Sequence, residues 1–200
     1  MSAQETRRRI LVAARRLFLE RGYAPTTMAA IAKAAAVSIE TVYLSIGGKA
    51  SLVRYLVETA LSGTDEPVPP LERAGVKEIR AEADPRRKLR LFAGMVRPML
   101  ERLAPIWQVV LEAASTDREL STLVAELQRR HAGSMRLVVQ HLAEVGRLRP
   151  AISKDMARDV VWAMNSPEFY RLLVDGRGWT GEMFESWLAD AWQRLLLDDT

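Results

Sequence analysis

Cysteine is absent from this chain of 200 residues, and histidine occurs only twice. Without a thiol the chain has no disulfide, no thiolate metal site and no cysteine nucleophile, a composition that fits a reducing cytoplasm. His131 and His141 are ten residues apart in a segment with helical periodicity, so about 15 Å of helix separates them. That distance is too long for two ligands of one metal ion. We therefore expect no metal site.

Long apolar runs are also missing. No window holds 18 uncharged apolar residues, as a membrane-spanning helix requires, and the N-terminal segment lacks the apolar core of a secretory signal. Hydrophobic residues make up 48% and charged residues 27% of the chain, which is typical of a globular protein. The sequence predicts a cytoplasmic protein with no membrane partner.

Strand patterns do not occur, whereas apolar residues recur at a spacing of three and four along almost the whole chain. This periodicity predicts an all-α fold. A first helix ends at Gly22, and a fourth helix covers residues 49–62. Because three prolines fall within residues 63–70, that stretch reads as a linker. We therefore expect an N-terminal three-helix domain within residues 1–63 and a C-terminal helical bundle over residues 71–200.

Several helix limits can be predicted within the second domain. A helix begins at Pro85 and gives way to a new one at Pro105, because proline is favoured at a helix start and disfavoured inside a helix. Asp117 caps a helix of roughly 28 residues. The sequence Asn165-Ser166-Pro167 interrupts a later helix, which restarts at the proline.

The positive charge is concentrated at the start of the chain. Residues 1–60 carry nine Lys or Arg and four Asp or Glu, a net charge of +5, whereas residues 61–200 carry 20 basic and 21 acidic residues. A basic module joined to a neutral one indicates an anionic partner for the first module, and nucleic acid is the most common such partner. A basic solvated surface without a partner is the alternative explanation of this charge.

Two short helices joined by a turn of three to four residues follow the first helix. Thr27 precedes one and Ser38 the other, and each hydroxyl can accept a hydrogen bond from a free helical N–H. The arrangement is typical of a helix-turn-helix, whose second helix enters the major groove of DNA. On that helix Val42 and Ile46 would face the core, and the outward side chains would be Glu40, Thr41, Leu44 and Ser45.

These residues, in this order and spacing, resemble the DNA-binding domain of the tetracycline-repressor-like (TetR) family of transcriptional regulators. The resemblance lies in RRRILVAARRLFLERGY at residues 7–23, TTMAAIAKAAAVSIETVY at residues 26–43 and GKASL at residues 48–52. It covers about 55 residues. The rest of the chain resembles the family only in its helical pattern and length.

The resemblance implies roles for single positions. Thr27 and Lys49 match the family's phosphate-contacting residues, and Thr41 and Tyr43 match positions of the recognition helix that touch DNA. Lys49 also precedes the fourth helix directly, where its ammonium and the free N–H groups of that helix can hold one phosphate. The complete set of predicted DNA-binding residues is Thr27, Ser38, Glu40, Thr41, Tyr43, Leu44, Ser45 and Lys49.

Three positions depart from the family pattern. Ala36 stands where glycine is most common, so we expect the turn to avoid a left-handed backbone there. Ser45 replaces a frequent aromatic residue and Ile46 replaces a usual phenylalanine. Glu40 and Leu44 are variable positions in the family, where a carboxylate could accept from a cytosine amino group and an apolar side chain could meet a thymine methyl.

Residues 176–181 match the dinucleotide-binding pattern G-x-G-x-x-G. A dinucleotide site needs a strand before this pattern and a second strand after it. A helical pattern precedes it here, so we interpret the segment as a turn between helices and expect no cofactor. Nor does the chain contain a recognisable pairing of nucleophile and base, so we do not expect an enzyme.

The second domain contains two candidate interaction regions. An apolar small-molecule effector is a candidate partner for a cavity lined by adaptable methionines and aromatic walls, although ordinary core is the alternative role of the same side chains; these are Met95, Met99, Trp107, Trp162 and Met164. The last helix carries a wide apolar stripe that could be core or, as the resemblance implies, a homodimer interface. That stripe comprises Phe184, Trp187, Leu188, Ala191, Trp192 and Leu195.

The sequence thus predicts a ligand-responsive transcriptional regulator, a repressor that binds a palindromic operator in double-stranded DNA as a dimer. A shift of the fourth helix would carry the response of a ligand to the DNA-binding domain. The alternative is a helical interaction protein whose helix-turn-helix no longer binds DNA specifically.

Overall fold

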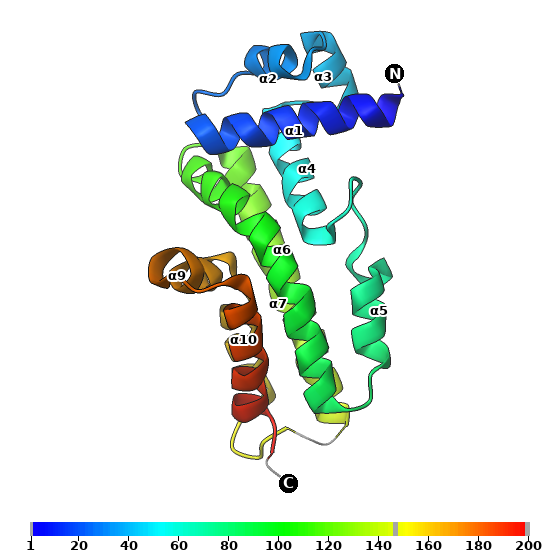
Figure 1. Ribbon diagram of the computed structural model, residues 1–200, viewed down its shortest axis with the longest axis vertical. Coiled ribbons are helices and arrows are strands. Elements are labelled where there is room, and N and C mark those ends of the chain that lie inside the picture. Colours follow the sequence, from blue (N-terminus) through cyan, green and yellow to red (C-terminus); the bar gives the residue numbers. More distant parts are fainter. Residues whose placement is uncertain (1, 146–147, 199–200) are drawn as a thin grey trace. The chain divides into compact units, whose positions relative to one another are not determined.

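The computed structural model describes residues 2–145 and 148–198, and within these ranges it is built of α-helices (Figure 1). The only extended pairing in these ranges is an isolated antiparallel bridge between Leu148 and Leu197. The predicted all-α fold is confirmed. In chain order the helices are α1 (Ala3–Arg21), α2 (Met28–Ala35), α3 (Ile39–Ser45), α4 (Lys49–Ser62), the 3-10 helix η1 (Pro70–Glu72), α5 (Ala74–Ala81), α6 (Pro85–Ala114), α7 (Arg118–Glu144), α8 (Lys154–Met164), α9 (Pro167–Arg177) and α10 (Gly181–Leu196).

The chain packs as two compact units. The first contains residues 1–68 and 105–126, and the second contains residues 69–104 and 127–200. The long helices α6 and α7 therefore each contribute one part to each unit. A single division at the predicted linker would instead assign residues 105–126 to the second unit.

The core of the first unit lies where α1 packs against α2, α3 and α4. Figure 1 shows α2 and α3 on the same side of α1. The hydroxyl of the buried Thr26 hydrogen-bonds to the carbonyl oxygens of Leu17 and Gly22 at 3.2 and 2.8 Å, which fastens the α1–α2 loop to the end of α1. Each helix turns one apolar face inward, and the buried side chains include Ile10, Ala14, Phe18, Ile31, Val42 and Leu52.

The turn between α2 and α3 differs from the expectation at one residue. Ala36 adopts the left-handed conformation, with φ 52° and ψ 50°, which costs a residue with a Cβ atom about 1–2 kcal/mol. Hydrogen bonds offset this cost: the Ala36 N–H donates to Lys33 O at 3.2 Å, and the guanidinium of Arg9 donates to Ala35 O at 2.5 Å. The prediction that Ala36 avoids this backbone was wrong because neighbouring groups stabilise it.

Helix α6 runs unbroken from Pro85 to Ala114, so the predicted start of a new helix at Pro105 was wrong. A proline inside a helix removes one N–H donor and crowds the preceding turn. The residues on either side, Ala104 and Ile106, are both buried. Packing of the neighbouring turns therefore maintains the helix despite the local cost.

Other predicted helix limits are confirmed. Asp117 caps α7, because its Oδ1 accepts from the N–H groups of Glu119 and Leu120 at 2.9 and 3.2 Å. A new helix, α9, begins at Pro167. Residues 176–181 contain the end of α9 and the start of α10, so a helix rather than a strand precedes the glycine pattern, as predicted.

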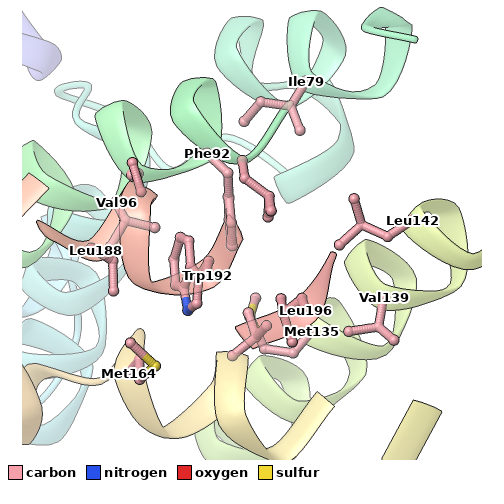
Figure 2. Packing of buried hydrophobic residues seen from close by; sticks show 14 of the residues in the cluster. Ile79, Phe92, Val96, Met135, Val139, Leu142, Met164, Leu188, Trp192 and Leu196 are labelled. Atoms are coloured by element: carbon pink, nitrogen blue, oxygen red, sulfur yellow. The ribbon is translucent and has the colours of Figure 1, made fainter. Parts of the chain in front are cut away.

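The core of the second unit gathers side chains from α5, α6, α7, α8, α9 and α10. Figure 2 shows Trp192 of α10 between Phe92 of α6 and Met164 of α8, and the Trp192 and Phe92 rings stack with centroids 5.0 Å apart. The buried ammonium of Lys88 also lies here, donating to Ile79 O at 2.7 Å and lying 3.1 Å from His141 Nδ1.

Among the described residues, a single helix long and apolar enough to cross a membrane does not occur. Helices α2 and α3 reach that length and hydropathy only when counted together, and a bend of 97° separates them.

Candidate functional site

Helix α3 is anchored to the first unit by few side chains. Val42 is fully buried, and Ile46, which follows the helix, is partly buried. The opposite face is open to solvent: Leu44 is 89% exposed and Tyr43 is 51% exposed. The other predicted DNA-binding side chains of this helix are at least partly exposed, and these are Glu40, Thr41 and Ser45.

The start of α3 is ordered by hydroxyl groups. Ser38 Oγ accepts from the Thr41 N–H at 3.1 Å, and the two hydroxyl oxygens lie 3.0 Å apart. Ser38 therefore caps the helix, as predicted. The backbone N–H of Glu40, followed by the Ser38 hydroxyl, lowers the pKa of the exposed Glu40 carboxyl. Glu40 is consequently a carboxylate at neutral pH and can only accept hydrogen bonds.

Two helix starts present groups suited to anions. Thr27 is exposed and caps α2, with its Oγ1 accepting from the Ala30 N–H at 3.1 Å. Gly48 is the N-cap residue of α4 and has no side chain with which to cap it. Lys49 is the first residue of α4, so its ammonium belongs to the electropositive end of a helix.

The Lys49 ammonium lies over an aromatic ring. Its Nζ is 4.1 Å from the centroid of the Tyr23 ring and donates to Ala24 O at 3.3 Å. Burial lowers the pKa of Lys49, while the negative charge of Asp117 opposes that shift. The Lys49 side chain is thus held against the α1–α2 loop, close to the start of its own helix.

The arginine run of α1 is partly engaged within the protein. Arg7 forms an ion pair with Glu66 at 2.9 Å, and Arg9 donates to Ala35 O at the end of α2. Arg8 is exposed, and its Nε lies 4.0 Å from Glu5 Oε2. Arg7 and Arg9 are therefore held by partners within the first unit, whereas Arg8 is exposed to solvent.

Polar contacts join residues 105–126 to the rest of the first unit. The Tyr23 hydroxyl donates to Asp117 Oδ2 at 3.0 Å. Arg54 of α4 forms a two-pronged hydrogen bond with Glu126 of α7, at 3.1 and 3.0 Å. Sequence reasoning missed both pairs. It identified Asp117 only as a helix cap, because caps depend on near neighbours, whereas 94 residues separate Tyr23 from Asp117.

The five predicted effector-binding residues lie in different surroundings. Trp107 is buried in the first unit, and Met164 is buried in the core of the second. Met95 and Met99 are partly buried against that same core. Trp162 is exposed on one side, with its ring centroid 6.0 Å from that of His131. Trp107 thus belongs to the first unit and the other four to the second.

A hollow of about 560 Å³ lies on the second unit. It includes Met95 but none of the other four predicted residues. Ile79, Leu91 and Met95 supply apolar surface, and Arg87, Arg90 and Glu78 supply charge. A volume of this size falls within the range of small-molecule sites.

Helix α10 carries two neighbouring apolar stripes. Phe184, Leu188 and Trp192 are fully buried in the core of their own protomer, so they cannot form an exposed dimer surface. This corrects the expectation for those three side chains. The adjacent stripe keeps solvent exposure, with Trp187 at 38% and Leu195 at 46%. It also includes Ala191, partly buried, and Met183, exposed, each four residues from the next.

The comparisons with known proteins agree with this architecture. The family model for bacterial regulatory proteins of the tetR family matches residues 10–56, which span most of α1 to α4. No curated protein sequence matches the chain.

Solved structures match the chain over nearly its whole length. One is NalD of Pseudomonas aeruginosa, the secondary repressor of the MexAB-OprM multidrug efflux pump, with 26% identity, full coverage of both chains and a TM-score of 0.74. A transcriptional regulator from Saccharomonospora viridis in complex with choline has 20% identity, a TM-score of 0.72 and coverage of 97% and 98%.

A TetR-family regulator from Mesorhizobium loti has 18% identity, a TM-score of 0.70 and coverage of 99% of this chain and 100% of its own. The last two likenesses concern the fold. The helix-turn-helix domain thus matches the family model of the TetR regulators, and the chain shares its fold with regulators of that family.

Proposed function

We propose that the protein is a transcriptional repressor that binds a palindromic operator through α3. The observation that carries this proposal is the exposure of Tyr43 and Leu44 on a short capped helix whose Val42 is buried. A core helix would bury its large apolar side chains, whereas a recognition helix must leave them available to base edges. The location of such a protein is the cytoplasm, where bacterial DNA lies.

The predicted residues divide into two kinds of contact. Lys49 and Thr27 stand at helix starts and contact phosphates, which positions the protein without reading sequence. Glu40, Thr41 and Leu44 face the bases, where the carboxylate accepts from cytosine and the leucine packs against a thymine methyl. Tyr43 and Ser45 contact the DNA backbone beside them, while Ser38 keeps the helix start in place.

A homodimer supplies the second recognition helix. Two such helices in a two-fold dimer enter successive major grooves about 34 Å apart. The exposed stripe of α10 is the surface we assign to this dimer, because apolar side chains at a spacing of four can pair with the same stripe of a second copy. It consists of Met183, Trp187, Ala191 and Leu195.

An effector regulates the proposed repressor by changing the distance between the two recognition helices. The ligand can change the DNA affinity by no more than the ratio of its own affinities for the two conformations, which differ in this distance. The hollow that includes Met95 is the site we assign to an apolar effector, and the Arg54–Glu126 contact ties α4 to α7 for transmission.

A salt titration of binding to a mixed-sequence duplex tests the DNA-binding function. The logarithm of affinity should fall steeply with the logarithm of salt concentration, and Lys49→Ala should reduce that slope by about one unit. Lys33→Ala, at an exposed lysine of α2 outside the predicted contacts, is the matched control. If the wild-type chain does not bind, the protein is instead a helical interaction module.

A further inference from the structure

Tyr23 contacts two groups of opposite charge. The Lys49 Nζ lies over its ring, 4.1 Å from the ring centroid, and its hydroxyl donates to Asp117 Oδ2 at 3.0 Å. The ring also stacks against Phe18 of α1, with centroids 5.8 Å apart. Tyr23 therefore spans the distance between the lysine at the start of α4 and the carboxylate that precedes α7.

Asp117 makes further hydrogen bonds at its end of this chain of contacts. Its other carboxylate oxygen accepts from two backbone N–H groups at the start of α7. The N–H of Leu120, and then the Tyr23 hydroxyl and other groups, keep the pKa of Asp117 below its usual value. Burial, followed by the hydrogen bond to Asp117, raises the pKa of Tyr23. At neutral pH the hydroxyl is therefore protonated and the acceptor ionised, which makes this a charge-assisted hydrogen bond.

Lys49 retains the capacity to bind a phosphate while it is held. An ammonium has three N–H donors, and Ala24 O takes one at 3.3 Å. A cation over an aromatic face is attracted to the ring without a hydrogen-bond acceptor being needed. The contact thus restricts the long flexible side chain and leaves donors for an oxyanion, which lowers the entropy lost on binding.

We infer that Tyr23 and Asp117 are positioning residues for the DNA phosphate contact of Lys49, so that the α6–α7 turn controls that contact through the α1–α2 loop. Asp117 belongs to the turn between α6 and α7, and both helices continue into the second unit. A movement of either helix displaces the acceptor of the Tyr23 hydroxyl and thereby the ring under Lys49. This route is separate from the one through α4, and it rests on the proposed DNA-binding function.

The test is a mutant cycle on binding to a mixed-sequence duplex of about 30 base pairs, followed by fluorescence anisotropy over a salt series. Tyr23→Phe keeps the ring and removes only the hydroxyl. It should weaken binding about threefold to tenfold, the range expected for part of one charge-assisted hydrogen bond, and it should lower the salt slope. In a Lys49→Ala background the same substitution should have no further effect.

A second arm isolates the hydrogen bond from net charge. Asp117→Ala removes the acceptor of the Tyr23 hydroxyl together with a negative charge and the cap of α7, so its single effect is not diagnostic. Combined with Tyr23→Phe it is, because both changes break the same hydrogen bond, and the loss caused by Tyr23→Phe should vanish when Asp117→Ala is present.

Tyr55→Phe is the matched control. The Tyr55 hydroxyl also donates to a carboxylate, that of Glu66, within the same unit. Loss of the Tyr55 hydroxyl should lower the unfolding midpoint, and so should loss of the Tyr23 hydroxyl. Tyr55→Phe, however, should leave the salt slope of DNA binding at the wild-type value. A merely structural role of Tyr23 would give the same pattern as Tyr55→Phe.

The outcomes separate the two proposals. If the wild-type chain binds and Lys49→Ala weakens it while Tyr23→Phe changes neither affinity nor slope, the positioning role is refuted and the DNA-binding function stands. An equal loss from Tyr23→Phe with and without Lys49 also refutes it. If the wild-type chain fails to bind duplex DNA, the proposed function itself fails.

Discussion

Helices α3 and α10 use their apolar side chains in opposite ways. Only Val42 is buried in α3, and Leu44 beside it is among the most exposed apolar residues of the chain. In α10 five side chains are buried, and they are Phe184, Leu188, Ala189, Trp192 and Leu196. Helix α3 is attached to its unit by one face only, whereas α10 is an integral part of a core.

This difference separates surface that is kept for a partner from surface needed for folding. A substitution on the open face of α3 removes few contacts within the protomer, so its effect should appear in DNA binding. A substitution on the buried stripe of α10 removes many contacts and should appear in stability. The exposed stripe of α10 resembles α3 in this respect, although its proposed partner is a second copy of the chain.

The largest effect should come from the buried stripe of α10. Trp192→Ala should lower the free energy of unfolding by about 3–5 kcal/mol, because it removes a ring stacked on Phe92 and leaves a cavity. Leu195→Glu, on the exposed stripe, should change protomer stability little and should dissociate the dimer. Denaturant unfolding measures the first effect and sedimentation velocity the second. Equal destabilisation by both would remove the distinction between the stripes.

A smaller effect in the same unit depends on pH. Burial lowers the pKa of His131 to about 4, with Glu168 opposing the shift. Between pH 6.5 and pH 4, His131 is therefore protonated in the unfolded chain and neutral in the folded chain. The free energy of unfolding consequently falls as the pH drops through this range. Between pH 7 and pH 5 the loss attributable to His131 should be about 2 kcal/mol.

His131→Phe removes the titrating group and keeps a ring beside Trp162. Urea unfolding of the two proteins at both pH values measures the difference. If the variant loses as much stability on acidification as the wild-type chain, His131 is not the group responsible.

On α3, Thr41→Ala should weaken binding to the preferred operator by about 1–2 kcal/mol, the scale of one base contact. It should leave binding to unrelated duplexes unchanged, since it removes no charge. Competition of operator and random duplex for the same protein measures the ratio. An equal loss on both would refute a base-reading role for Thr41.

The smallest expected effect concerns the turn that orients α3. Ala36→Gly should raise the free energy of unfolding by about 0.5–1 kcal/mol, because glycine adopts the left-handed backbone without a Cβ clash but loses more entropy on folding. Differential scanning calorimetry would detect the higher midpoint. A lower midpoint would show that the turn holds Ala36 without strain.

What could be predicted from the sequence follows from the range of the interactions. Ser38 and Thr27 were predictable as caps, because each bonds an N–H three residues away. The pairing of Tyr23 with Asp117 was not, since it joins distant segments. On α10, positions 184 and 187 both satisfy helical spacing, and tertiary packing, with Tyr170 of α9 against Phe184, decides which of them is core. At Pro105 tertiary packing overrode a local rule.

Selection of bound sequences from a random duplex library tests the central account most directly. The chain should enrich a two-fold symmetric site whose half-sites lie about 10 base pairs, or a multiple of that distance, apart. Recovery of no preferred sequence by the wild-type chain, at salt concentrations where it still binds DNA, would contradict the assignment of α3 as a recognition helix.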